Sequence, residues 1–121
     1  MTPFGLHMRT LRAQRGITQK EMAQALNVSS AYLSALEHGK RGKPTWALIQ
    51  SILHYFNLIW DDADALVKLA DMSDPRMIID TAGLSPKATL LANRLAGSID
   101  CLAEEDMDAL LKILDQSQRL K

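Results

Sequence analysis

The chain has 121 residues, of which 47% are hydrophobic and four are proline, so we expect one globular domain or a small domain with an appendage. No apolar run approaches the ~20 residues of a membrane-spanning helix, and residues 1–12 lack the pattern of a signal peptide. Cys101 is the single cysteine, which excludes an internal disulfide and favours a reducing compartment. We therefore expect a soluble intracellular protein with Cys101 as an inert buried thiol.

The formal net charge is zero, but the charges are unevenly distributed. Residues 1–60 carry seven Lys or Arg and two Asp or Glu, a net charge of +5. Residues 61–121 carry seven Lys or Arg and twelve Asp or Glu, a net charge of −5. This asymmetry predicts a basic contact surface in the first half and an acidic module, mostly a solvated face, in the second.

Apolar residues recur at helical spacing along the whole chain, and no run alternates at period two. A first helix is predicted from Thr2 and Pro3 to about Arg15, because proline is favoured in the first turn. Gly16 then ends it in a left-handed conformation. Thr18 opens a second helix to about residue 26, with a glutamate three residues later completing a capping box.

The next signals predict a turn and a third helix. Asn27 tolerates the left-handed conformation that closes the second helix. Ser29 caps a third helix that runs to about His38 and is stopped by Gly39. Together these residues predict two short helices joined by a tight turn.

Two further helices complete the predicted N-terminal domain, which we place at residues 1–72. The fourth begins at Thr45 and continues through an apolar pattern to about Phe56. Asp61 or Asp62 opens the fifth, and the acidic residues there favour the positive end of a helix. Proline at position 75 follows its end.

Residues 73–85 form the predicted connector, and residues 86–121 a helical hairpin. Two alternatives are open for the apolar run 77–79: it pairs as a small strand with the same run of a second copy of the chain, or it serves as an extended linker. Two amphipathic helices cannot bury both apolar stripes alone, so we expect a four-helix bundle with a second copy. The alternative is that the hairpin packs on its own N-terminal domain. The expected dimer interface consists of Leu91, Leu95, Ile99, Leu102, Met107, Leu110 and Leu114.

The region 17–44 carries the strongest functional signal. Ala23 is small enough for two helices to cross closely, and Leu33 and Leu36 are spaced to anchor the second of them. This pattern resembles the helix-turn-helix of phage repressor and Cro-type proteins, also called the XRE family, over residues 4–72. The resemblance is carried by Gln19, Glu21, Ala23, Ser29, Leu33, Leu36, Glu37, Gly39 and Lys40.

The resemblance implies an all-α, five-helix DNA-binding domain whose third helix enters the major groove. It also implies an ion pair between Arg12 and Glu37 that holds the third helix, so Arg12 is not counted as a DNA ligand. The expected base-facing residues are Ser30, Ala31, Ser34, Ala35 and His38. The expected phosphate ligands are Gln19, Lys20, Ser29, Tyr32, Lys40, Arg41 and Lys43; the last three form a cationic loop, one residue longer than the family's common form.

The small side chains on the third helix lead to a hypothesis about specificity. None of its first four base-facing residues is an Arg, Gln or Asn, the side chains that discriminate bases by bidentate hydrogen bonds. We therefore expect specificity to depend on half-site spacing, DNA shape and the loop residues His38, Lys40 and Arg41.

No constellation for catalysis is present in the sequence, and the chain is predicted not to be an enzyme. The three histidines are too scattered for a metal site, and Asp61, Asp62 and Asp64 fit helix capping. No cofactor is expected. The leading interpretation is a homodimeric transcriptional repressor of a bacterium or its phage, cytoplasmic and nucleoid-associated. Two alternatives are an antitoxin whose acidic half neutralises a protein toxin, and an interaction adaptor that no longer binds DNA.

Overall fold

The computed structural model describes residues 1–118, which contain seven α-helices, one 3₁₀-helix and no strand. The predicted all-α class is therefore confirmed. The chain divides into two compact units, Met1–Met77 and Ile78–Lys121, and the division falls within the connector expected at residues 73–85. Of the module expected at residues 86–121, the last three residues lie outside the described part of the chain.

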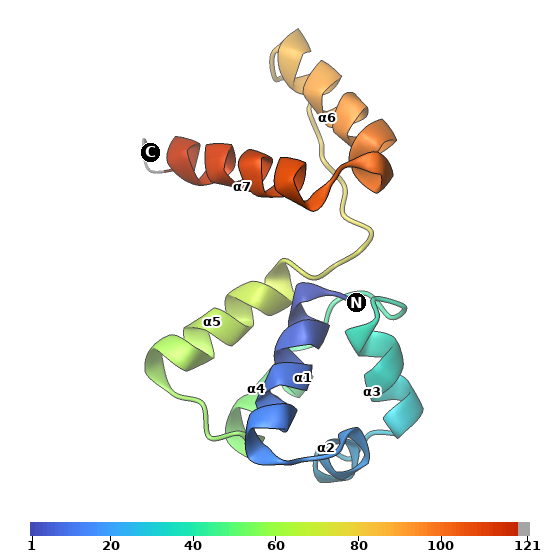
Figure 1. Cartoon of the computed structure of the whole chain (residues 1–121), viewed down its shortest axis with the longest axis vertical. Coiled ribbons are helices and arrows are strands. Elements are labelled where there is room, and N and C mark those ends of the chain that lie inside the picture. The colour runs from blue at the N-terminus through green and yellow to red at the C-terminus, as the bar shows by residue number, and fades with distance from the viewer. Residues whose placement is uncertain (119–121) are drawn as a thin grey trace. The chain divides into compact units, whose positions relative to one another are not determined.

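The N-terminal unit contains five helices around one apolar core. Figure 1 shows α1 lying between α3 and α5, with α2 beside the start of α3. Phe4, Met8, Met22, Ile52 and Leu66 are completely buried in this core, so apolar side chains from four helices hold the unit together. The helices are α1 (Pro3–Arg15), α2 (Gln19–Ala25), α3 (Ser30–Glu37), α4 (Trp46–Tyr55) and α5 (Trp60–Asp71).

The helix starts predicted from capping residues are confirmed. In each case a side-chain hydroxyl oxygen accepts a hydrogen bond from the backbone N–H three residues later, which satisfies one of the unpaired donors of the first turn. The left-handed conformations predicted for Gly16 and Asn27 are also confirmed, with φ values of 63° and 60°, and Gly39, which was expected to stop the third helix, has a φ of 78°. The predicted capping residues are Thr2, Thr18, Ser29 and Thr45, and Ser85 caps the helix that begins at Pro86 in the same way.

The start of α5 differs from the prediction. The helix begins at Trp60, and the preceding Ile59 provides no side-chain hydrogen bond to its first turn. Asp61 and Asp62 lie inside the first turn, where their charges are favourable near the positive end of the helix. Trp60 itself has a left-handed φ of 54°, and the helix begins there, one residue before Asp61.

The end of α5 is tied to the start of α1 by one buried serine. The Ser73 hydroxyl accepts a hydrogen bond from the Phe4 backbone N–H at 2.9 Å and donates one to the Leu69 carbonyl at 2.5 Å. Since Ser73 is buried, this contact closes the N-terminal unit across 69 residues of sequence.

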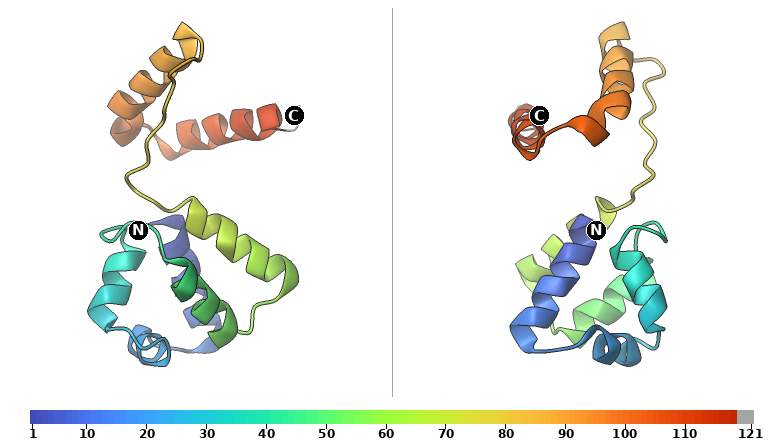
Figure 2. Two further views of the ribbon diagram at one scale, coloured as in Figure 1. Left: turned by 180° about the vertical axis from the view of Figure 1, so that it is seen from behind. Right: turned by 45° about the vertical axis from the view of Figure 1, so that its right-hand side comes forward.

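The second unit contains α6 (Pro86–Ser98), the 3₁₀-helix η1 (Ile99–Cys101) and α7 (Glu104–Gln118). Figure 2 shows α6 and α7 joined through η1. None of the residues in these three elements is buried. The expectation of a buried Cys101 is therefore wrong for the single chain: Cys101 is exposed, because the unit encloses no core that could cover it. Residues 77–79 are exposed and belong to no helix.

Candidate nucleic-acid interface

Helices α2 and α3 pack against each other through small and apolar side chains. Ala23 is buried where the two helices meet, and Leu33 and Leu36 are buried beneath α3. The turn between them is closed by a hydrogen bond from the Val28 N–H to the Ala23 carbonyl at 3.0 Å. With Asn27 in the left-handed conformation, this arrangement fixes the orientation of α3 relative to α2.

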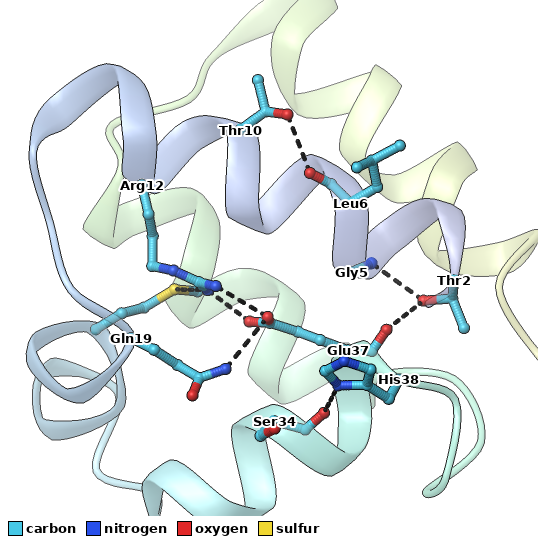
Figure 3. Close-up of polar contacts among 10 residues, drawn as sticks. Thr2, Gly5, Leu6, Thr10, Arg12, Gln19, Ser34, Glu37 and His38 are labelled. Carbon is cyan, nitrogen blue, oxygen red and sulfur yellow. Dashed lines mark hydrogen bonds and ion pairs between the residues drawn. The ribbon is translucent and has the colours of Figure 1, made fainter.

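The outward face of α3 carries the small residues predicted to meet DNA bases. Ser30 and Ala31 are exposed, and Ser34 and Ala35 are half-buried. His38 follows at the end of the helix, with its ring Nδ1 2.8 Å from the Ser34 carbonyl oxygen (Figure 3). A carbonyl oxygen can only accept, so this contact favours the tautomer with hydrogen on Nδ1, whose Nε2 is an acceptor.

A buried ion pair holds the far end of α3. The Arg12 guanidinium donates to both carboxylate oxygens of Glu37, at 2.5 and 2.9 Å. Glu37 is 1% exposed, and the Gln19 side-chain amide also donates to its Oε1 at 3.3 Å (Figure 3). Arg12 and Glu37, expected as an ion pair, and Gln19, expected as a phosphate ligand, thus lie together in one hydrogen-bonded cluster. A bidentate arginine–carboxylate contact has a fixed geometry, so it fixes α3 relative to α1.

Two residues at the start of α1 reinforce this anchor, and the sequence interpretation did not assign them this role. The Thr2 N–H and hydroxyl both donate to the Glu37 carbonyl oxygen, at 3.0 and 3.3 Å. A Cβ added at Gly5 would lie 2.1 Å from that same oxygen, so only glycine allows α1 to approach α3 this closely. The signal was a glycine inside a predicted helix, where it costs about 1 kcal/mol and usually has a packing reason.

The cationic loop lies directly after α3, and its members point to different neighbours. Lys40 and Arg41 are exposed, and the Arg41 guanidinium carbon is 5.9 Å from the centroid of the Tyr32 ring. Such a cation–π contact holds Arg41 beside α3. Lys43 instead contacts α5, with its Nζ 3.5 Å from Asp71 Oδ1. The remaining predicted phosphate ligands, Lys20 and Ser29, are exposed on or beside the same pair of helices.

This geometry agrees with a comparison against protein families. A family described as a helix-turn-helix domain matches residues 3–66, more than half of the chain, and the match includes α2, α3, the cationic loop and the ion pair of Arg12 with Glu37. The chain belongs to the XRE-type helix-turn-helix family. The resemblance to this family that was inferred from residues 17–44 is therefore confirmed.

Two relatives from Bacillus subtilis (strain 168) carry the same kind of domain. One is described as an uncharacterized HTH-type transcriptional regulator, RghRB, and is 42% identical over 52 residues. The other, the HTH-type transcriptional repressor RghR, is 40% identical over 52 residues. Each match covers 43% of this chain and only 37% or 38% of the relative's length, so the similarity covers less than half of either protein. No solved structure matches this chain.

None of the helices in residues 1–118 combines the length and the hydropathy that a membrane-spanning helix needs. The same residues bring together no group of three or more His, Cys, Asp or Glu side chains able to hold a metal ion.

Proposed function

We propose that this protein is a homodimeric, sequence-specific DNA-binding transcriptional repressor that inserts α3 into the major groove. One observation carries the proposal: α3 is rigidly anchored on its inner side and presents a face of small side chains flanked by cations. In the helix-turn-helix, the second helix reads base edges while neighbouring residues bind the phosphates. A face without bulky side chains allows the helix backbone to approach the bases closely.

The phosphate ligands surround this face. Lys20, Ser29 and Tyr32 flank the start of the recognition helix, and the loop residues Lys40 and Arg41 follow its end. Gln19 donates one amide hydrogen to Glu37, and its second amide hydrogen can bind a phosphate oxygen. About four to six such contacts per protomer would make binding steeply dependent on salt, since each contact lowers the slope of log K against log salt by about 0.9.

Base discrimination in this proposal is mostly indirect. Serine hydroxyls read bases ambiguously and alanine contacts only the thymine methyl group, so the α3 face supplies little direct readout. His38 Nε2, an acceptor in the tautomer described above, suits an amino group of adenine or cytosine. Half-site spacing and DNA shape supply the rest of the specificity.

Repression and dimerisation are the finer parts of the proposal. A single helix-turn-helix covers only half of a two-fold-symmetric operator, so two copies bind half-sites one helical turn apart. The relative RghR is described as a repressor, and occlusion of a promoter is the simplest way for a small DNA-binding dimer to act. Neither the relatives' descriptions nor the described residues favour the antitoxin alternative.

The test is selection of binding sites from a random DNA library by the full chain at two salt concentrations. We expect enrichment of a short two-fold-symmetric sequence, with affinity falling steeply as salt rises. Arg41→Ala should weaken binding to all sequences, and Lys68→Ala on the exposed side of α5 is the matched control. Absence of binding at both salt concentrations would contradict the proposal, and salt-sensitive binding without a motif would contradict sequence specificity.

A second experiment tests the indirect readout. The double variant Ser30→Ala and Ser34→Ala removes both hydroxyls from the α3 face without changing its shape. We expect the selected sequence to change little, because these hydroxyls discriminate bases weakly. A loss of sequence preference in this variant would show that the serines read the bases directly.

A further inference from the structure

The second unit exposes the apolar residues that a helical core would use. Leu91 on α6 is 62% exposed and Leu111 on α7 is 58% exposed. Their apolar neighbours Leu90, Ile99, Ile113 and Leu114 are more than half exposed as well. Two amphipathic helices with uncovered stripes of this size require a partner surface, because exposed apolar residues gain free energy by burial.

The charges beside these two leucines are opposite and equally spaced. Lys87 and Arg94, the only charged residues of α6, lie four residues before and three after Leu91. Asp108 and Asp115 on α7 lie three residues before and four after Leu111. Residues three or four apart share one side of a helix, so each leucine is flanked by two charges of one sign, seven residues apart.

These charges form no ion pair in the described part of the unit, residues 78–118. Among residues 1–118, neither Lys87 nor Arg94 forms an ion pair with any acidic residue of α7. All four flanking side chains are exposed. Helix α6 carries a net charge of +2 and α7 a net charge of −4, so copies of the same helix would repel each other while α6 and α7 attract.

We infer that two copies of this chain associate by reciprocal pairing of α6 with the partner's α7. Leu91 of one copy contacts Leu111 of the other. Lys87 and Arg94, beside Leu91, form ion pairs with Asp108 and Asp115, which flank Leu111 in the other copy. The arrangement occurs twice about the two-fold axis, which closes a four-helix bundle. Pairing of α6 with α6 or of α7 with α7 would instead place like charges opposite each other.

This inference rests on the homodimer proposed above and specifies its contacts. It is tested with two charge-reversal variants of the full chain, one carrying Lys87→Glu and Arg94→Glu and the other Asp108→Lys and Asp115→Lys. Dimer dissociation constants are measured by sedimentation equilibrium, and the composition of mixtures by native mass spectrometry. Glu105→Lys, which lies on the side of α7 away from its apolar stripe, is the control.

Each reversal variant alone should dissociate at concentrations on the order of tenfold higher than the wild type, because attractive pairs become repulsive in both copies. Mixing the two variants should restore a heterodimer of wild-type strength, since every reversed helix then meets a complementary one. Glu105→Lys should leave the dissociation constant unchanged. Circular dichroism of each variant verifies that helix content is retained.

Three results would overturn the inference. Reversal variants that dimerise as tightly as the wild type would point to pairing of like helices. If dimerisation is restored by combining all four substitutions in one chain but not by mixing the two variants, the contact of α6 with α7 lies within one chain. A monomeric wild type would refute the dimer itself. The DNA-binding proposal would still be tested separately, by measuring with fluorescence anisotropy whether a single helix-turn-helix binds a half-site.

Discussion

The two units of this protein differ in what they bury. The N-terminal unit encloses a continuous apolar core and a buried ion pair between Arg12 and Glu37. The helices of the C-terminal unit bury no residue, although their apolar stripes are as regular as those of α1 and α4. The contrast agrees with the proposal that the C-terminal unit is completed by a second copy of the chain.

The strongest test of the complete unit removes one partner of its buried ion pair. Arg12→Ala leaves the Glu37 carboxylate buried without its main donor, and such a loss costs about 3–5 kcal/mol of unfolding free energy. Denaturant unfolding followed by tryptophan fluorescence measures it, because Trp46 and Trp60 both lie in the N-terminal unit. Arg9→Ala on the exposed side of α1 is the control.

A double variant separates the cost of burying an unpaired charge from the contribution of the ion pair. Arg12→Met combined with Glu37→Leu removes both charges, so no unpaired carboxylate remains and the unit should regain most of the lost stability. If Arg12→Ala lowered the unfolding free energy by less than about 1 kcal/mol, which is the range of an exposed ion pair, this ion pair would not be a structural anchor of α3.

A matched pair of leucine truncations compares the two units directly. Leu33→Ala in the core should cost about 2–5 kcal/mol of unfolding free energy. Leu91→Ala should change the tryptophan-detected stability by less than about 0.5 kcal/mol and should weaken the dimer instead. The measurements are denaturant unfolding and sedimentation equilibrium on each variant. A large loss of N-terminal stability in Leu91→Ala would show that α6 packs on its own helix-turn-helix unit.

A smaller effect is expected at the point where the N-terminal unit closes. Ser73→Ala removes the hydroxyl that accepts from the Phe4 N–H, and an unsatisfied buried donor costs about 1–3 kcal/mol. Ser51→Ala is the control, because the exposed Ser51 hydroxyl only donates to a carbonyl of its own helix. Unfolding curves of the two variants that coincide would mean that water replaces the Ser73 hydroxyl.

The predictions from sequence succeeded where the determining chemistry is local. Thr18 caps α2 and Asn27 adopts the left-handed conformation, because a cap or a turn depends on residues within three or four positions. The family pattern likewise identified the helix-turn-helix, since Ala23 and Leu33 serve the packing of adjacent helices.

The predictions failed or were incomplete where the determining contact is distant in sequence. The role of Thr2 depends on a carbonyl 35 residues away, and that of Ser73 on an N–H 69 residues away. The exposure of Cys101 depends on whether two helices enclose a core, which their apolar spacing cannot decide. The DNA contacts assigned to the α3 face and the loop stay predictions, since they require a partner outside the chain.

The smallest effect on stability is expected at the exposed pair of Lys43 and Asp71, which are 3.5 Å apart. An exposed ion pair contributes about 0–1 kcal/mol, so Lys43→Ala and Asp71→Asn should both leave the unfolding free energy nearly unchanged.

The effects of these two substitutions on DNA binding should be opposite. If Lys43 binds phosphate as proposed, Lys43→Ala should lower affinity for all sequences and reduce the salt slope by about 1. Asp71→Asn removes the carboxylate that competes with phosphate for Lys43, so affinity should rise. Fluorescence anisotropy across a salt series measures both variants, and equal salt slopes for Lys43→Ala and the wild type would assign Lys43 to α5 rather than to DNA.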